Sequence, residues 1–192
     1  MLIEKLKMEY LEGESGYVGL IGQDDTLVST LGGGEEAPAL RQALPAQSQI
    51  YYMLTEEFPL NALHWLEPCD THILLEGGPV DYYIFYPDGT AEMRILGTDL
   101  GAGQTHVVPV PSNCFKALRL HTGSPFALIA NCLSPGWTPE RVRIGAGNDF
   151  LRRYIGAASW ATAERLRELI GPNFTGDDGS AREMSRPSLQ SG

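Results

Sequence analysis

Two histidines and an aspartate lie close together between residues 64 and 72 of the chain. Asp70 and His72 are two residues apart, and His64 precedes them in a neighbouring apolar run. Alternate residues of a β-strand point to the same face, so Asp70 and His72 share one face if this segment is a strand. A carboxylate can orient an imidazole that acts as a general base near neutral pH. The spacing therefore predicts proton-transfer chemistry on a small molecule.

The residues around this cluster have the pattern of a β-protein. From residue 49 onward, short apolar runs alternate with turn residues at intervals that are typical of an antiparallel sandwich or barrel. Pro87, Asp88 and Gly89 form the clearest hairpin turn, because Asp-Gly supplies the positive φ angles that a tight turn requires. The inner face of such a barrel is where a small ligand can be held. We expect eight strands, over residues 50–54, 62–66, 71–75, 81–86, 91–96, 106–110, 116–120 and 126–133.

The two ends of the chain have a different character. Apolar residues at helical spacing over residues 2–8 predict a short N-terminal helix. Residues 149–170 have helical features and are followed by a Gly-Pro pair, which stops a helix. We therefore expect a C-terminal helical extension over residues 146–174 and a polar, disordered tail over residues 175–192.

Composition and charge exclude several classes of function. The 192 residues favour a single domain, and the net charge of −10 disfavours nucleic acid and anionic membranes as partners. The three cysteines are odd in number and widely spaced, so we expect neither a disulfide framework nor a zinc knuckle. The sequence contains no signal-peptide core and no apolar run of ~20 residues, so we expect a cytoplasmic protein. The glycine-rich segment 32–38 lacks the Lys-Ser/Thr of a phosphate-binding loop and is interpreted as a linker.

The segment around His64 resembles the first motif of the cupins. In that motif a His-x-His pair is followed by an acidic residue and then by a glycine, and His64, Asp70 and Gly77 have this spacing. Leu66 stands where the second histidine would be. His72 is a further departure, because it occupies a position where a related group of small cupins usually has tryptophan. This departure adds an imidazole to the inner face of the barrel.

A second stretch resembles the other cupin motif, in which a glycine is followed by Pro-x-Gly and then by a histidine. Gly103 and residues 111–113 follow this pattern, with Asn113 in place of the second glycine, but Lys116 stands where the histidine would be. An ammonium at a ligand position repels a divalent cation. The resemblance, with this replacement, therefore implies a cupin that holds no metal firmly.

Further segments resemble the small cupins of the cupin-5 group, whose members are often labelled predicted sugar epimerases. The matching segments follow one another in order from the first residues to Trp137 and include residues 2–6, 50–54, 77–79, 87–89, 96–104 and 134–136. The resemblance implies an all-β fold, the antiparallel double-stranded β-helix or cupin jelly-roll barrel, over residues 1–145. The helical extension over residues 146–174 lies outside the resemblance.

The resemblance and the strand pattern together indicate four candidate catalytic residues: His64, Asp70, His72 and Lys116. The imidazoles and the carboxylate would move a proton next to a carbonyl group, and a partly desolvated Lys116 would stabilise the developing enolate oxygen. We expect an isomerase, epimerase, cyclase or lyase that acts on a small polar or carbonyl-bearing metabolite and has no cofactor. The candidate substrate-binding residues are Tyr52, Tyr83, Phe85, Arg94, Gln104 and Trp137.

Two other functions stay open on the sequence. His64, Asp70 and His72 could instead hold a divalent metal such as iron, zinc or nickel, which would make the protein a metal-dependent cupin. The barrel could also bind a metabolite without converting it, because a histidine in a half-buried strand is more often a hydrogen-bonded structural residue than a catalyst. The resemblance also implies a homodimer formed through sheet edges, so the expected partners are a small molecule and a second copy of the chain.

Overall fold

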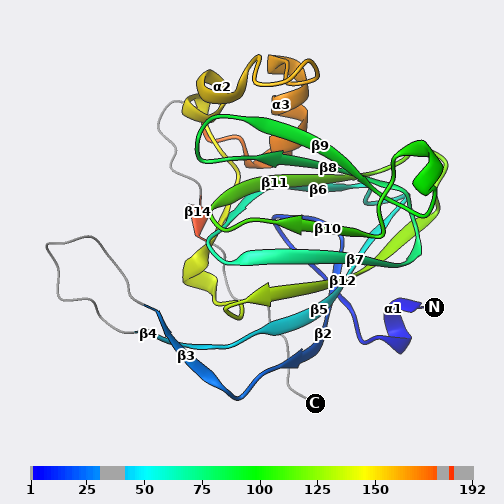
Figure 1. Ribbon diagram of the computed structural model, residues 1–192. Coiled ribbons are helices and arrows are strands. Elements are labelled where there is room, and N and C mark those ends of the chain that lie inside the picture. The colour runs from blue at the N-terminus through cyan, green and yellow to red at the C-terminus, as the bar shows by residue number, and fades with distance from the viewer. Residues whose placement is uncertain (1, 31–41, 177–181, 184–192) are drawn as a thin grey trace, which may run out of the picture.

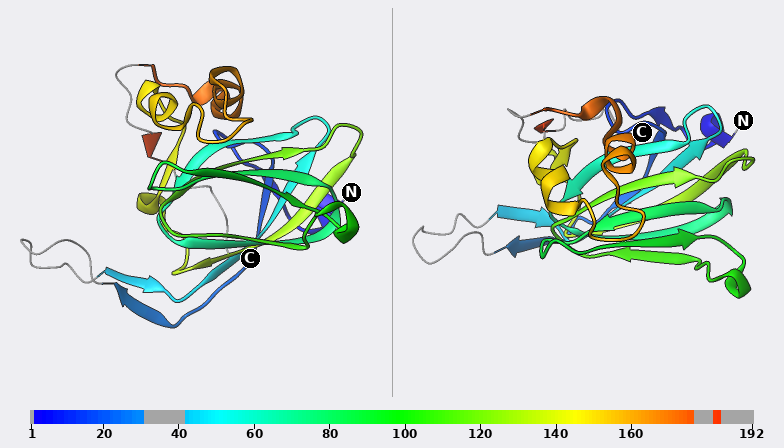
Figure 2. Two further views of the ribbon diagram at one scale, coloured as in Figure 1. Left: turned by 45° about the horizontal axis from the view of Figure 1, so that its top comes forward. Right: turned by 90° about the horizontal axis from the view of Figure 1, so that it is seen from above.

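The computed structural model describes residues 2–30, 42–176 and 182–183, and these residues form a sandwich of two antiparallel sheets (Figure 1). The first sheet contains, in spatial order, β1 (Glu9–Tyr10), β2 (Tyr17–Gln23), β5 (Ser48–Thr55), β12 (Phe126–Ser134), β7 (Cys69–Gly77) and β10 (Val107–Val110). The second sheet contains β14 (Arg182–Glu183), β13 (Val142–Ile144), β6 (Leu60–Leu66), β11 (Cys114–Leu120), β8 (Val80–Phe85) and β9 (Ala91–Leu96). A separate hairpin of β3 (Leu27–Thr30) and β4 (Gln42–Pro45) extends away from the sandwich (Figure 2).

This architecture confirms the predicted fold class, which is mostly β with a short N-terminal helix and C-terminal helices. All eight predicted strands are present as β5 to β12. The pattern did not predict β1 to β4, β13 or β14, because these strands are short or contain many glycine and polar residues. The N-terminal helix α1 (Leu2–Lys5) ends earlier than predicted, since Lys7 adopts a positive φ of 50° and Met8 packs into an apolar cluster.

The C-terminal extension contains two helices, in agreement with the helical features predicted over residues 149–170. These helices are α2 (Asn148–Tyr154) and α3 (Ala163–Ile170). The hydroxyl of Thr162 accepts a hydrogen bond from the Arg165 amide and caps the start of α3. The helix ends at Gly171, which adopts a positive φ of 60°, as the Gly-Pro pair predicts.

The tail does not fully follow the predicted disorder. Residues 182–183 form β14, which pairs with Arg143 and Ile144 of β13. The remaining residues of the tail from position 177 onward lie outside the described residues, as does the glycine-rich segment 32–38. Within the described parts of the chain, none of the helices combines the length and the apolar character that crossing a membrane requires.

The C-terminal helices cover the outer face of the second sheet (Figure 2). The ring of Phe85 on β8 packs against Phe150, Tyr154 and Trp160 at centroid distances of 4.9, 5.2 and 5.7 Å. The ring of Tyr83 lies 5.0 Å from that of Trp160. These aromatic side chains belong to one buried cluster outside the sandwich, which fixes the helices to the sheet.

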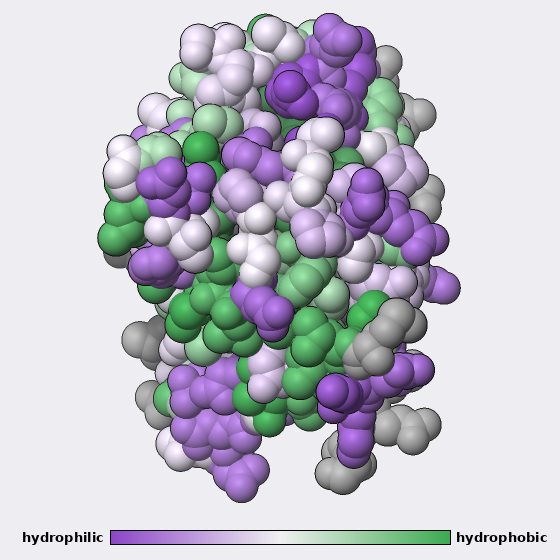
Figure 3. Space-filling view, turned by 90° about the vertical axis from the view of Figure 1, so that its right-hand side faces the viewer, coloured by the Kyte–Doolittle hydropathy of each residue, from purple (hydrophilic) through white to green (hydrophobic). Residues whose placement is uncertain are grey.

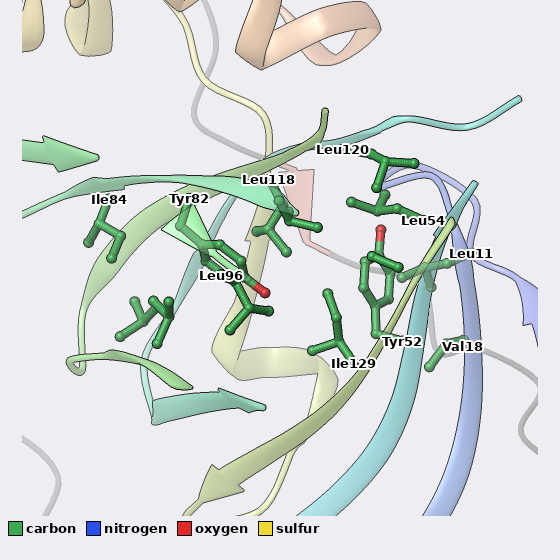
Figure 4. Packing of buried hydrophobic residues seen from close by; sticks show 14 of the residues in the cluster. Leu11, Val18, Tyr52, Leu54, Tyr82, Ile84, Leu96, Leu118, Leu120 and Ile129 are labelled. Atoms are coloured by element: carbon green, nitrogen blue, oxygen red, sulfur yellow. The ribbon is translucent and has the colours of Figure 1, made fainter. Parts of the chain in front are cut away.

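The position of this cluster corrects part of the predicted ligand site. The inward-facing neighbours on β8 are Tyr82 and Ile84, which belong to the core between the sheets (Figure 4). Successive residues of a strand point to opposite faces, so Tyr83 and Phe85 point outward. The prediction that Tyr83 and Phe85 line the ligand pocket is therefore wrong.

The core between the sheets occupies only part of the sandwich. Leu54 and Ile129 of the first sheet meet Leu96 and Leu118 of the second sheet, and all four are almost completely buried (Figure 4). Their burial supplies the hydrophobic free energy that holds the two sheets together. The remaining space between the sheets is a cavity.

Candidate functional site

The cavity has a volume of about 450 Å³, which lies within the range of pockets that hold a small organic molecule. Polar side chains project into it from both sheets and from the loops at its ends, namely Glu14, Gln23, Ser48, Tyr52, Asn61, His64, His72, Lys116, Asn131 and Thr138. The apolar part of the wall consists of Leu11, Val18, Leu20, Ile50, Leu66, Leu118, Leu133, Trp137 and Pro139. The cavity therefore offers a polar region and an apolar region to the same ligand.

Strand register brings four of the polar side chains to one level of the sandwich. Lys116 on β11 pairs directly with His64 on β6 in the second sheet. Asn131 on β12 pairs directly with His72 on β7 in the first sheet. All four side chains point between the sheets and line the cavity. One cross-strand pair from each sheet, His64 with Lys116 and His72 with Asn131, thus forms the centre of the polar part of the wall.

Lys116 bridges the two sheets. Its ammonium contacts Oδ2 of Asp70 and lies 3.3 Å from Nε2 of His72, and both partners are on β7 of the opposite sheet. The same carboxylate oxygen lies 2.9 Å from His72 Nε2. Asp70, His72 and Lys116 have only 1%, 2% and 2% of their surface exposed. The structure thus brings together three of the four predicted catalytic residues in a buried cluster at the cavity wall.

Burial changes the proton affinity of this cluster. Desolvation lowers the pKa of Lys116 from 10.5 to about 7, although the Glu14 carboxylate acts in the opposite direction. Contact with the Asp70 carboxylate also favours the ammonium form. Desolvation lowers the pKa of His72 from 6.5 to about 3, so its imidazole is neutral at pH 7. The cluster therefore contains an amine, that of Lys116, which can gain or lose a proton near neutral pH, next to the neutral imidazole of His72.

His64, the fourth predicted catalytic residue, has one ring nitrogen engaged and one available. Its Nδ1 lies 2.9 Å from the carbonyl oxygen of Ala62, which can only accept a hydrogen bond. We therefore assign the proton to Nδ1. Nε2 of this cavity-lining residue then carries no proton and can act as a base. Burial lowers the pKa of His64 to about 4, while Glu14, with Oε2 3.6 Å from Nδ1, raises it.

Glu14 reaches the cavity from the loop before β2. Its main-chain oxygen accepts a hydrogen bond from the Ala62 amide at 2.7 Å, and its carboxylate accepts one from Asn61 Nδ2 at 3.2 Å. Gly16 has a φ of 88°, and a Cβ atom there would clash with the Tyr52 hydroxyl. The sequence pattern did not single out Glu14, because loops have no alternation, and its only signal is an acidic residue between two nearby glycines, Gly13 and Gly16.

The remaining predicted substrate-binding residues divide between the cavity and the surface. Tyr52 and Trp137 line the cavity. Arg94 lies on β9, an edge strand of the second sheet, where it forms an ion pair with Glu92 at 2.8 Å. Gln104 follows the short 3₁₀ helix of residues 100–102 and accepts a hydrogen bond from the Asp99 amide at 3.0 Å. The prediction that Arg94 and Gln104 line the pocket is therefore wrong, because both side chains stabilise local structure away from it.

The side chains present do not fit the metal centre that a cupin resemblance implies. Among residues 2–30, 42–176 and 182–183, no group of three His, Cys, Asp or Glu side chains is arranged to hold a metal ion. The Lys116 ammonium already contacts the Asp70 oxygen and the His72 nitrogen that would act as ligands. A cation at this point would lie next to a positive charge, which disfavours its binding.

Comparison with known proteins relates this cavity to one family. Residues 1–145 match the model of Cupin_5, described as the cupin superfamily (DUF985). The uncharacterized protein YML079W of Saccharomyces cerevisiae is 32% identical over 110 residues, which are 56% of this chain and 54% of the yeast protein. The chain therefore spans about half the length of the curated relative that it matches.

Two solved structures are similar to this one. Protein SO0799 from Shewanella oneidensis has a TM-score of 0.69 and 21% identity, with 88% of this chain and 94% of that chain covered. A hypothetical protein from Leishmania major has a TM-score of 0.66 and 18% identity, with 79% and 86% covered. At these identities the two structures support the fold alone. Because the family model covers more than half of the chain, the chain belongs to the Cupin_5 family of the cupin superfamily.

Proposed function

We propose that this cupin is an acid–base enzyme that moves a proton on a carbon next to the carbonyl group of a small metabolite. This step is used by many isomerases, epimerases and lyases and by some cyclases. The observation that carries the proposal is the pairing of His64 with Lys116 on adjacent strands. His64, whose Nε2 carries no proton in this assignment, and Lys116 thereby line the same cavity. Enolate formation requires a base that removes the proton and a positive charge that stabilises the oxygen, and neighbouring residues can supply both to one substrate.

Each residue has a distinct role in the proposed step. His64 Nε2 removes the proton, and the Glu14 carboxylate then stabilises the imidazolium that forms. Lys116 stabilises the negative charge that develops on the carbonyl oxygen, and this effect is strengthened because its side chain is only 2% exposed and is weakly screened by bulk water. Asp70 and His72 hold the Lys116 amine in place.

The residues that line the cavity indicate the class of substrate. Its polar region lies around His64, Lys116 and Asn131, and its apolar region includes Leu133 and Trp137. A substrate that places a carbonyl group in the polar region would pack the rest of its carbon skeleton against the apolar region. We therefore propose a carbonyl-bearing metabolite with an apolar part.

Proton exchange tests the proposed function. Incubation of the protein with hydroxyacetone, pyruvate or phenylacetone in deuterated water is expected to accelerate exchange of the protons next to the carbonyl group, as measured by NMR. His64→Gln is expected to reduce the protein-dependent rate by at least about 10²-fold, because a positioned general base contributes 10²–10⁴-fold. His106→Gln is the matched control, since His106 is exposed and lies outside the cavity wall.

Two results would contradict the proposal. Exchange that is equally fast with His64→Gln and with the unmodified protein would exclude His64 as the base. A ketone that binds, as seen by ligand-observed NMR, without any exchange would favour the alternative function, a binding protein that does not convert its ligand.

We also propose that the chain forms a homodimer. The outer face of β7 and β10 exposes Ile73, Leu75 and Val107, and β10 is an edge strand of the first sheet. The side of the molecule near α1 also has apolar surface surrounded by hydrophilic residues (Figure 3). Covering such a face or edge with a second copy removes apolar area from water. Light scattering is expected to give twice the mass of one chain, and a mass near 21.0 kDa would contradict the dimer.

A further inference from the structure

The lysines of this protein have an unusual distribution. The chain contains only three, Lys5, Lys7 and Lys116, among 14 lysine and arginine residues, so arginine supplies most of the positive charge. Lys5 and Lys7 are exposed in the N-terminal segment. Lys116 is 2% exposed and lines the cavity. The one lysine outside the N-terminal segment is thus the one that faces the proposed substrate.

We propose that Lys116 binds its substrate covalently, as a Schiff base with an aldehyde or ketone. The inference rests on the proposed function and deepens it, because the positive charge next to the reacting carbon would then be an iminium ion rather than a separate ammonium. It also narrows the substrate class to aldehydes and ketones, since carboxylic acids and esters do not form imines.

Three geometric features support this role for Lys116. Its amine reaches across the sandwich to Asp70 and His72, so the side chain is extended and fixed at the cavity wall. His64 is its direct cross-strand neighbour and can act on a carbon that is bonded to the iminium group. Lys116 is only 2% exposed, so bulk water has little access to an imine formed at its nitrogen.

The lowered pKa of the Lys116 amine also supports a role as a nucleophile. Burial lowers the pKa of Lys116 to about 7. At neutral pH a lysine with this pKa has a free-amine fraction about 10³-fold greater than a lysine with the ordinary value near 10.4. Only the free amine is a nucleophile, and lysines desolvated in pockets are activated in this way.

The covalent step balances without any further reactant. The amine nitrogen adds to the carbonyl carbon, forming a C–N bond, and the carbonyl oxygen takes up a proton. The resulting carbinolamine then loses this oxygen as water. In total, one ammonium group and one carbonyl group give one iminium ion and one water molecule. The iminium ion acidifies the neighbouring C–H bond, from which His64 Nε2 removes the proton to leave a neutral enamine.

A purely structural role explains the cluster less well. Buried ion pairs are often no more stable than apolar side chains of similar volume, because both charges lose their hydration. The sheets already share an apolar core that includes Leu118, two residues from Lys116 on the same strand. A lysine that points into a cavity, instead of a leucine or methionine, is therefore better explained by chemistry than by stability.

Acetylacetone is a suitable probe, because it condenses with a free amine to a stable vinylogous amide that absorbs in the near ultraviolet. The experiment uses the full chain with Lys5→Arg and Lys7→Arg, so that Lys116 is its only lysine. At neutral pH we expect one equivalent of probe at Lys116, with loss of one water, which peptide mass spectrometry distinguishes from reaction at the α-amino group. In the unmodified protein, Lys116 is expected to react at least about tenfold faster than Lys5 and Lys7.

A matched variant and a second readout complete the test. Lys116→Arg keeps the positive charge next to Asp70 but cannot form the adduct, and circular dichroism checks that it is folded. No adduct at Lys116 in the folded protein, or a rate no faster than at Lys5 and Lys7, would overturn the inference.

Proton exchange on the same samples separates this inference from the proposed function. His64-dependent exchange of hydroxyacetone without reactivity at Lys116 overturns the Schiff base and leaves the proposed function in place. An adduct at Lys116 without any exchange supports the reactive amine and overturns the proposed function.

Discussion

Replacement of Lys116 by methionine is expected to lower the free energy of unfolding by about 3–5 kcal/mol, because it leaves the Asp70 carboxylate buried without its ammonium partner. The second oxygen of Asp70, Oδ1, already has no hydrogen-bond partner among the described residues. Domains of this size are typically stable by only about 5–15 kcal/mol, so this single change would remove a large fraction of the total. Urea unfolding followed by tryptophan fluorescence measures the effect.

The double variant Lys116→Met with Asp70→Asn is the matched control. It removes both charges and leaves an amide next to His72 Nε2, so it is expected to recover most of the lost stability. If the double variant were as unstable as Lys116→Met alone, the loss would come from packing of the lysine stem rather than from an unpaired charge. Equal slopes of the urea transitions would show that both variants unfold from a similarly compact state.

Acid is expected to destabilise the protein through its two buried histidines. Burial lowers the pKa of His64 from 6.5 to about 4 and that of His72 from 6.5 to about 3. Below pH 6.5 the unfolded chain therefore binds more protons than the folded protein, and stability falls with decreasing pH. The loss begins near pH 6.5 and levels off near pH 4 for His64 and near pH 3 for His72. Its size is on the order of 3 kcal/mol for His64 and 5 kcal/mol for His72.

Thermal unfolding at a series of pH values measures this dependence. His64→Gln is expected to lose less stability than the unmodified protein between pH 6.5 and 4, because it removes one buried titrating ring. His106→Gln is expected to follow the unmodified protein, since His106 is exposed. A His64→Gln curve parallel to that of the unmodified protein would show that His64 is not held neutral in the fold.

The sequence was most informative where one face of a strand is buried and the other is not. On β7, Asp70 and His72 are buried while Ile73 and Leu75 are partly exposed, and strand alternation placed the two polar residues on one face. The register between β6 and β11 then brought Lys116 next to His64, which a single sequence without the cupin resemblance does not specify.

On β8, the alternation of apolar and polar residues could not predict which side chains face the cavity, and the reason is physical. The inner residues Tyr82 and Ile84 and the outer residues Tyr83 and Phe85 are all buried, because the C-terminal helices cover the outer face of this strand. A strand buried on both faces reads as a continuous apolar run without a signal for which residues face inward. The helices that hide the outer face are distant in sequence, so their effect is visible only in three dimensions.

The positions of loop side chains could not be predicted from the sequence either. Glu14 reaches the cavity because hydrogen bonds to Asn61 and Ala62 fix its loop, and these contacts span more than forty residues of sequence. The same limitation applies to Gln104, which looked available for a ligand but binds the amide of Asp99. Neither outcome follows from local spacing.

The covered outer face of the second sheet also makes the C-terminal helices part of the cavity's support. Phe115 on β11 lies 5.2 Å from the ring of Phe150 on α2, and Ala117 on the same strand is buried in the same outer cluster. Lys116 lies between these two residues and points the opposite way, into the cavity. The strand that presents Lys116 to the cavity is thus supported from behind by the C-terminal helices, although none of residues 146–174 lines the cavity itself.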